Sequence, residues 1–186
     1  MRRRFPVVLA LVAIAAACSG DDGAERGEGG EITEAGPVSV FELRIGDCLS
    51  LEDGLSGDLK DLSAVPCSEP HTQEVFALPE MEAEGDVYPG EDEIKSFADA
   101  ACLEAFPEYT GQDYLDAEGL YFSYLHPSLD SWNEGDDRQI VCVIGGTGGE
   151  SLTGTVRDSG SGSDEAEDAD EDETTTTSTT APEGEG

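Results

Sequence analysis

The clearest periodic pattern in the chain lies between residues 91 and 107. Apolar side chains recur there at helical spacing, and three acidic residues stand in the first turn, where a helix dipole favours negative charge. Pro107 predicts the end of this helix, because proline removes a helical hydrogen bond and its ring clashes with the preceding turn. Cys102 falls on the apolar stripe and is expected to face the core. The stripe consists of Ile94, Phe97, Ala98, Ala101, Cys102 and Ala105.

Four further segments have the β-branched and aromatic composition of strands. In the last of them Ile140, Cys142 and Ile144 share one face, so Cys142 is also expected to point inward. Residues 51–64 are rich in glycine, aspartate and serine and predict a loop, whereas the two prolines in 65–71 favour extended backbone. The predicted strands are 38–43, 73–78, 120–125 and 139–144.

Composition divides the chain into one foldable zone and two flanks. Residues 38–157 hold every aromatic side chain except Phe5, so only this zone has the material for a core and we expect one domain there. The elements predict an α+β fold, with a small antiparallel sheet packed with one main helix. The flanks 18–37 and 158–186 have almost no large apolar side chains and are expected to be a flexible linker and a disordered tail.

The predicted tail has two low-complexity runs. The acidic run 168–173 offers loose attraction to divalent cations, but its spacing matches no EF-hand. The threonine-rich run 174–180 resembles an O-glycosylated stalk, although a plain solvated tail is the favoured interpretation.

Residues 1–17 have the layout of a secretory signal peptide, with three arginines, an apolar stretch and then three alanines. The stretch is shorter than the ~20 apolar residues that cross a membrane as a helix. Cys18 follows the alanines directly, and this arrangement resembles the lipobox of bacterial lipoproteins, with Ala15 where leucine is commoner. The resemblance implies removal of 1–17, fatty acylation of Cys18 and anchoring on the outer face of the cytoplasmic membrane. Simple secretion and a twin-arginine route are the alternatives.

The formal charge of the chain is −34 at pH 7. Such acidity argues against a nucleic-acid-binding protein, because phosphate contacts need clustered Lys and Arg. It also means that anionic lipid headgroups repel the protein, so the linker is expected to hold the domain away from the membrane surface. A salty habitat is an alternative explanation of the acidity.

Four cysteines remain besides Cys18, and an even number in an exported domain predicts two disulfides. Of the three connectivities, Cys48–Cys67 with Cys102–Cys142 is favoured, because each bond closes a short loop between predicted elements. Free thiols and a metal site are the alternatives. A metal is not expected, because the chain has no C-x-x-C pair.

Several short motifs stand in a fixed order along the chain. The most diagnostic are the run C-S-x-P-H-x-x-E-V from Cys67 to Val75 and the run from Trp132 to Cys142, which has an extra aspartate before Arg138. This succession resembles the septum-formation domain family of actinobacterial envelope proteins and covers about 45–144. The resemblance implies an envelope-associated module that is not an enzyme and uses no cofactor.

His71 and Glu74 form the first candidate binding pair. They have the residue types of two zinc ligands or of a base with its orienting group, but a zinc site needs a third ligand. A nucleophile pair of Ser68 with His71 is a further alternative, although no strand-turn-helix elbow surrounds Ser68. The favoured interpretation is structural: His71 bonds a turn after Pro70, and Glu74 lies on the wet face of a strand.

Trp132 and Arg138 form the second candidate pair. Exposed together they would make an aromatic and cationic recognition patch. The favoured interpretation is that Trp132 packs over a disulfide, while Arg138 pairs with Asp47, Asp136 or Asp137.

These features together predict a lipid-anchored extracytoplasmic protein that binds another envelope or division protein. The alternative is a module that binds a small ligand or a peptidoglycan fragment through the Pro70–Glu74 segment and Trp132. We expect no catalytic activity.

Overall fold

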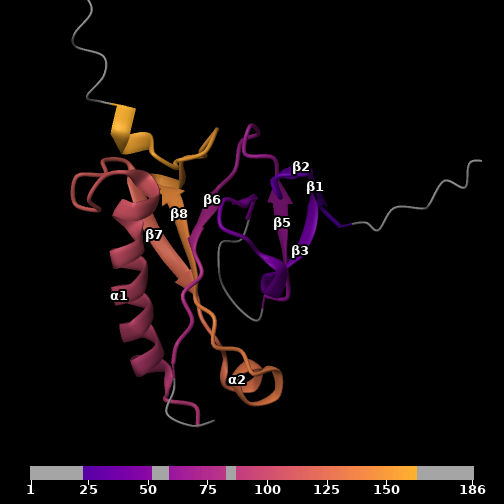
Figure 1. Cartoon of the computed structure of the whole chain (residues 1–186), viewed down its shortest axis with the longest axis vertical. Coiled ribbons are helices and arrows are strands. Elements are labelled where there is room, and N and C mark those ends of the chain that lie inside the picture. The colour runs from indigo at the N-terminus through magenta and orange to yellow at the C-terminus, as the bar shows by residue number, and fades with distance from the viewer. Residues whose placement is uncertain (1–22, 52–58, 83–86, 163–186) are drawn as a thin grey trace, which may run out of the picture.

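A computed structural model of the chain describes residues 23–51, 59–82 and 87–162 (Figure 1). This part of the chain contains strands, two α-helices and short 3₁₀ turns, so the predicted α+β class is confirmed. The strands are β1 (Glu25–Arg26), β2 (Ile32–Glu34), β3 (Gly36–Ser39), β4 (Cys48–Leu49), β5 (Asp61–Val65), β6 (Gln73–Ala77), β7 (Leu120–Leu125) and β8 (Val141–Gly146). The helices are α1 (Glu91–Thr110) and α2 (Leu129–Gly135), and the 3₁₀ turns are η1 (Val40–Glu42), η2 (Thr147–Gly149) and η3 (Ser159–Gly162).

Six antiparallel strands form the main sheet in the order β3-β5-β4-β6-β8-β7, and β1 pairs with β2 in a separate hairpin. Both faces of the central strands are buried. On β8, Cys142 and Ile144 join the core cluster that contains α1, whereas Val141 and Val143 join a second cluster formed with β3, β4 and β5. The sheet therefore has a helix on one side of its centre and its own first strands on the other (Figure 1).

Helix α1 begins at Glu91 as predicted but continues beyond the expected end at Pro107. Phe106 and Tyr109 are buried in the α1 cluster, so packing holds the last turn in place despite the proline. The helix ends when Gly111 adopts the left-handed conformation and its N–H donates to the carbonyl of Pro107.

Three local predictions in the first half of the sheet are wrong. The predicted strand 38–43 ends at Ser39, whose hydroxyl accepts a hydrogen bond from the N–H of Phe41 and starts η1. The predicted loop 51–64 contains most of β5, which pairs with β3 on one edge and with β4 on the other. The segment 65–71, predicted to be extended, contains a turn closed by the bond from Glu69 N to Pro66 O.

The predicted linker 18–37 is wrong for residues 23–37. This segment forms β1, β2 and the start of β3, and Ile32 is buried against β5 and its neighbours. Its fixed point is Arg26, whose guanidinium makes two hydrogen bonds of 2.6 and 2.7 Å to the buried carboxylate of Asp47. Because the segment is rich in glycine and acidic residues, its composition did not indicate that Ile32 and Arg26 attach it to the domain.

The other end of the domain also lies beyond the predicted boundary at residue 157. The N–H of Asp158 donates to the carbonyl of Tyr109, and η3 follows at 159–162. The signal peptide 1–17, Cys18 and the rest of the predicted tail, 163–186, lie outside the described residues.

Both expected disulfides are present, which confirms the predicted pairing. Cys48–Cys67 joins β4 to the turn after β5, and Cys102–Cys142 joins α1 to β8 (sequence separations 19 and 40). The entropy model gives roughly 3 and 4 kcal/mol of stabilisation for loops of these lengths.

Candidate functional site

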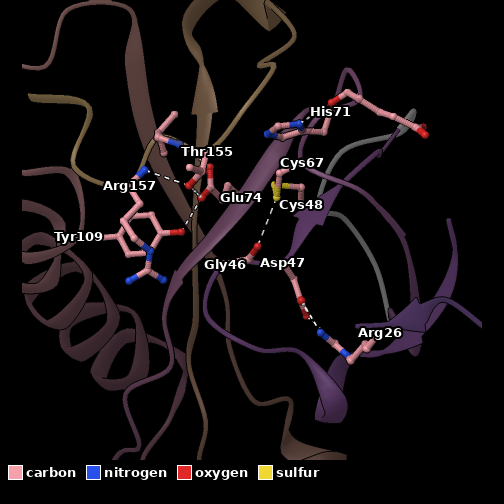
Figure 2. Close-up of a disulfide and its surroundings, with 12 residues drawn as sticks. Arg26, Gly46, Asp47, Cys48, Cys67, His71, Glu74, Tyr109, Thr155 and Arg157 are labelled. Carbon is pink, nitrogen blue, oxygen red and sulfur yellow. Dashed lines mark hydrogen bonds and ion pairs between the residues drawn. A yellow bond between two sulfur atoms is a disulfide. The ribbon is translucent and has the colours of Figure 1, made fainter. Parts of the chain in front are cut away.

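A buried polar cluster lies at the start of β6, where the sequence placed its first candidate pair. The Glu74 side chain is fully buried and faces α1, not solvent, so the expected wet face is wrong. Because both faces of β6 are covered, alternation along the strand offers no exposed side. Its carboxylate accepts hydrogen bonds from the hydroxyls of Tyr109 and Thr155 and from the N–H of Val156 (Figure 2).

Tyr109 contributes the helical side of this cluster. Burial raises the pKa of its hydroxyl well above the usual value, and the hydrogen bond to the Glu74 carboxylate raises it further. The Arg157 guanidinium stacks on the Tyr109 ring, 4.4 Å from its centre. Nothing in the sequence marked Tyr109 or Thr155, because they lie 35 and 81 residues from Glu74.

His71 is also buried, and it bonds a turn as predicted, but that turn spans Pro66–Glu69 and so precedes Pro70 instead of following it. Its Nδ1 lies 2.9 Å from the carbonyl oxygen of Glu69, while its Nε2 has no hydrogen-bond partner among the described residues. In the part of the chain that the structure describes, the ring bonds this carbonyl and not Ser68, so the proposed nucleophile pair is not brought together.

The structure adds a sulfur to the pair formed by His71 and Glu74. Cys48 Sγ, a ring nitrogen of His71 and a carboxylate oxygen of Glu74 all lie within 4.8 Å of one another. In the disulfide with Cys67 this sulfur is not a thiolate, which is the form that binds metals. Cys48 was predicted only as a disulfide partner, so its position beside His71 was not foreseen.

The residues of the second candidate pair, Trp132 and Arg138, pack on each other. Trp132 is 1% exposed and shares the core cluster that contains both Cys102 and Cys142. The Arg138 guanidinium stacks on the Trp132 ring at 3.7 Å and pairs with Asp136 at 3.1 Å, one of its expected partners. Arg138 therefore packs against Trp132, and Trp132 offers no exposed aromatic surface.

A wide groove of about 1180 Å³ lies on a different part of the molecule. Its walls come from the end of β3 with η1, from residues 59–61, from the end of β7 and from α2. Phe41 and Leu129 line it and are 64% and 53% exposed, a large apolar area for a surface that no described residue covers. Neither residue was a candidate in the sequence, because Leu129 lies in α2, which was not predicted, and Phe41 was assigned to the predicted strand 38–43.

Helix α2 begins at a capping box formed by Ser128 and Ser131. The Ser128 hydroxyl accepts a hydrogen bond from the N–H of Ser131, and the Ser131 hydroxyl accepts one from the N–H of Ser128. Trp132 anchors the helix in the core, whereas Leu129, the first residue of the helix, is 53% exposed and lines the groove.

Among the described residues, no helix is long and apolar enough to span a bilayer. Helix α1 has 20 residues, which is long enough to span a bilayer, but it carries several charged residues.

Comparison with known proteins gives one match. Neither the curated proteins nor the solved structures contain a chain that matches this one. The sequence model of the family described as "Septum formation" matches residues 19–142, which is more than half of the chain. The match includes β1 to α2, both disulfides and, from the buried polar cluster, Glu74 and Tyr109 but not Thr155 and Val156. The chain belongs to the septum formation family, and its role lies in cell division or the cell envelope.

Proposed function

We propose that the protein is a lipid-anchored module on the outer face of the cytoplasmic membrane that binds a segment of another envelope or division protein. The groove between η1 and α2 is the observation that carries this proposal, because it combines volume, exposed apolar side chains and a polar rim. The membrane position rests on the lipobox resemblance at Cys18.

The charge of the groove defines the partner. Among the residues that line it, five carry carboxylates, whereas Lys60 is the one lysine and there is no arginine. A segment with apolar side chains for Phe41 and Leu129, flanked by Lys or Arg, complements this surface in shape and sign. The carboxylates are Asp61, Glu91, Asp130, Glu134 and Asp137.

The alternative function, binding of a small ligand or peptidoglycan fragment, was assigned to the Pro70–Glu74 segment and Trp132. The side chains of His71, Glu74 and Trp132 are at most 1% exposed, so they offer no surface to such a ligand. The groove is therefore the better candidate.

The groove proposal predicts site-specific crosslinking in cells. A photocrosslinking amino acid at position 41 or 129 is expected to form adducts with an envelope or division protein. The yield of these adducts should fall as salt rises, because salt screens the attraction between the two proteins. The matched control is position 115, because Leu115 is 93% exposed but does not line the groove. Equal adducts from positions 41 and 115, or none from 41 and 129, contradict the proposal.

The anchor has a test of its own. Wild-type protein is expected to partition into the detergent phase with a mass increased by acyl chains, because dual acylation holds a protein on a membrane. Cys18→Ser is expected to accumulate as an unlipidated precursor. If that variant were processed to the wild-type mass and stayed equally membrane-bound, the anchor proposal would fail while the groove proposal would stand.

A further inference from the structure

The three ligand-type atoms at Cys48, His71 and Glu74 are the starting point. All three residues are fully or almost fully buried, and their sulfur, nitrogen and oxygen atoms lie within 4.8 Å of one another. Figure 2 shows them where β4, the turn after β5 and the start of β6 meet. A tetrahedral zinc site with bonds of about 2.0–2.3 Å places its ligand atoms about 3.4–3.6 Å apart. Side-chain shifts of about 1 Å therefore bring these atoms into zinc geometry.

The imidazole of His71 is held in the form that binds a metal. A carbonyl oxygen only accepts, so the 2.9 Å contact with Glu69 O places the ring proton on Nδ1. Nε2 then carries a lone pair, and it is buried without a hydrogen-bond partner in residues 23–51, 59–82 and 87–162. Metal-ligating histidines show this arrangement, with one ring N–H fixed on a carbonyl and the other nitrogen free.

The carboxylate of Glu74 is oriented in the same manner. Tyr109 and Thr155 hold Oε1, and the N–H of Val156 holds Oε2, 2.8 Å away. Oε2 keeps a free acceptor position, because a carboxylate oxygen has two lone pairs. Such outer hydrogen bonds fix ligating carboxylates in metal sites.

The remaining ligand is masked by its bond to Cys67. We propose that reduction of the Cys48–Cys67 disulfide opens a site for one Zn²⁺, ligated by the Cys48 thiolate, His71 Nε2 and Glu74, with Cys67 or water in the fourth position. Thiolate, imidazole and carboxylate together suit zinc among the common divalent ions. The inference is independent of the partner groove.

The redox step balances with an external dithiol as reductant. One thiolate of the dithiol attacks Cys67 Sγ, which belongs to the more exposed of the two cysteines, and Cys48 leaves as a thiolate. The second thiol of the dithiol then displaces Cys67 and completes the disulfide of the oxidised reductant. Two electrons enter the protein, Cys67 keeps one proton, and zinc binding releases the other from Cys48.

Cys67→Ala tests the inference without a reductant, because it frees the Cys48 thiol and leaves Cys102–Cys142 intact. Titration of the full chain carrying this substitution with Zn²⁺ is expected to show one site per chain and proton release. Co²⁺ in place of Zn²⁺ is expected to give a thiolate charge-transfer band. Oxidised wild-type protein is expected to bind Zn²⁺ at least tenfold more weakly and to show no such band, which separates this site from diffuse acidic binding.

Second substitutions in the Cys67→Ala chain identify the ligands. His71→Ala and Glu74→Gln are each expected to weaken Zn²⁺ binding at least tenfold, in the range seen when metal-site contacts are lost. His126→Ala is the matched control, since His126 is the chain's other histidine and is not part of the cluster. Equal Zn²⁺ affinity in the His71→Ala and His126→Ala chains overturns the proposal.

A second measurement covers the case in which Cys67→Ala does not fold. Wild-type protein reduced with a dithiol is treated with an alkylating reagent, with and without Zn²⁺, and labelling of Cys48 is followed by peptide mass. Zn²⁺ is expected to slow Cys48 labelling tenfold or more, and less so in His71→Ala. Unchanged labelling of Cys48 with Zn²⁺ contradicts the site.

Discussion

At the scale of single residues, the polar side chains in this fold act in pairs that sequence distance conceals. Asp47 is buried because Arg26, 21 residues earlier, supplies a bidentate partner. Glu74 is buried because the C-terminal segment supplies Thr155 and Val156. A carboxylate without such donors is costly to bury, so a sequence pattern alone places both residues at the surface.

The residue whose titration is most perturbed gives a pH prediction. Tyr109 ionises at a higher pH in the folded protein than the value of about 10 in an unfolded chain, so its contribution to stability is complete below pH 10 and is lost as pH rises above it. The free energy of unfolding of wild type is expected to fall above pH 10 more steeply than that of Tyr109→Phe, by up to about 1.4 kcal/mol per pH unit.

Urea denaturation between pH 8 and 11 measures this difference. The Cys18→Ser background removes the one cysteine that is outside the two disulfides. At neutral pH Tyr109→Phe is expected to lose about 1–3 kcal/mol, because a buried carboxylate oxygen loses a donor. Parallel pH profiles for the two proteins would show that Tyr109 is not the titrating group.

At the scale of elements, the sequence predicted those helices and strands whose pattern depends on residues close together in the chain. The stripe of α1, the inward face of 139–144 and the strand β7 depend on side chains close together in sequence, and the structure contains all three. The pairing of the cysteines followed from the same faces, because Cys102 and Cys142 both point into the α1 cluster.

The elements that the sequence missed depend on partners elsewhere in the chain. β5 lies in a glycine- and serine-rich region, yet it forms a strand because β3 and β4 flank it on both edges. β1 and β2 are short and polar, and Ile32 with the Arg26–Asp47 pair holds them on the sheet. α2 begins at a capping box whose N3 residue is Ser131, where the usual sequence signature has Glu or Gln, so the local pattern did not mark it.

At the scale of the whole molecule, the described domain is longer than the aromatic-rich zone at both ends. Its first elements are the paired strands β1 and β2. Its last segment includes Thr155 and Val156, which donate hydrogen bonds to Glu74, and then η3. This segment closes the polar cluster on the side away from the groove, so the two proposed activities occupy separate parts of one fold. A composition boundary marks where a core can form, whereas the domain boundary also includes polar segments that the core positions.

The C-terminal boundary gives the last prediction, through two truncations that differ by eight residues. A chain ending at Gly162 loses 163–186, which holds ten acidic and no basic residues and no aromatic or large aliphatic side chain. Its melting midpoint is expected to stay within about 2 °C of the full chain, or to rise slightly at low salt as like charges are removed.

A chain ending at Gly154 also loses Thr155 and Val156, and with them two of the three donors to the buried Glu74 carboxylate. Hydrogen bonds to a charged group contribute about 1.5–3 kcal/mol each, and a domain of this size moves roughly 4 °C per kcal/mol, so this midpoint is expected to drop by about 10 °C or more. Calorimetry of both chains in the Cys18→Ser background measures the difference. Equal midpoints would show that the carboxylate is satisfied without the C-terminal segment, and a large drop for the longer chain would place part of 163–186 on the domain.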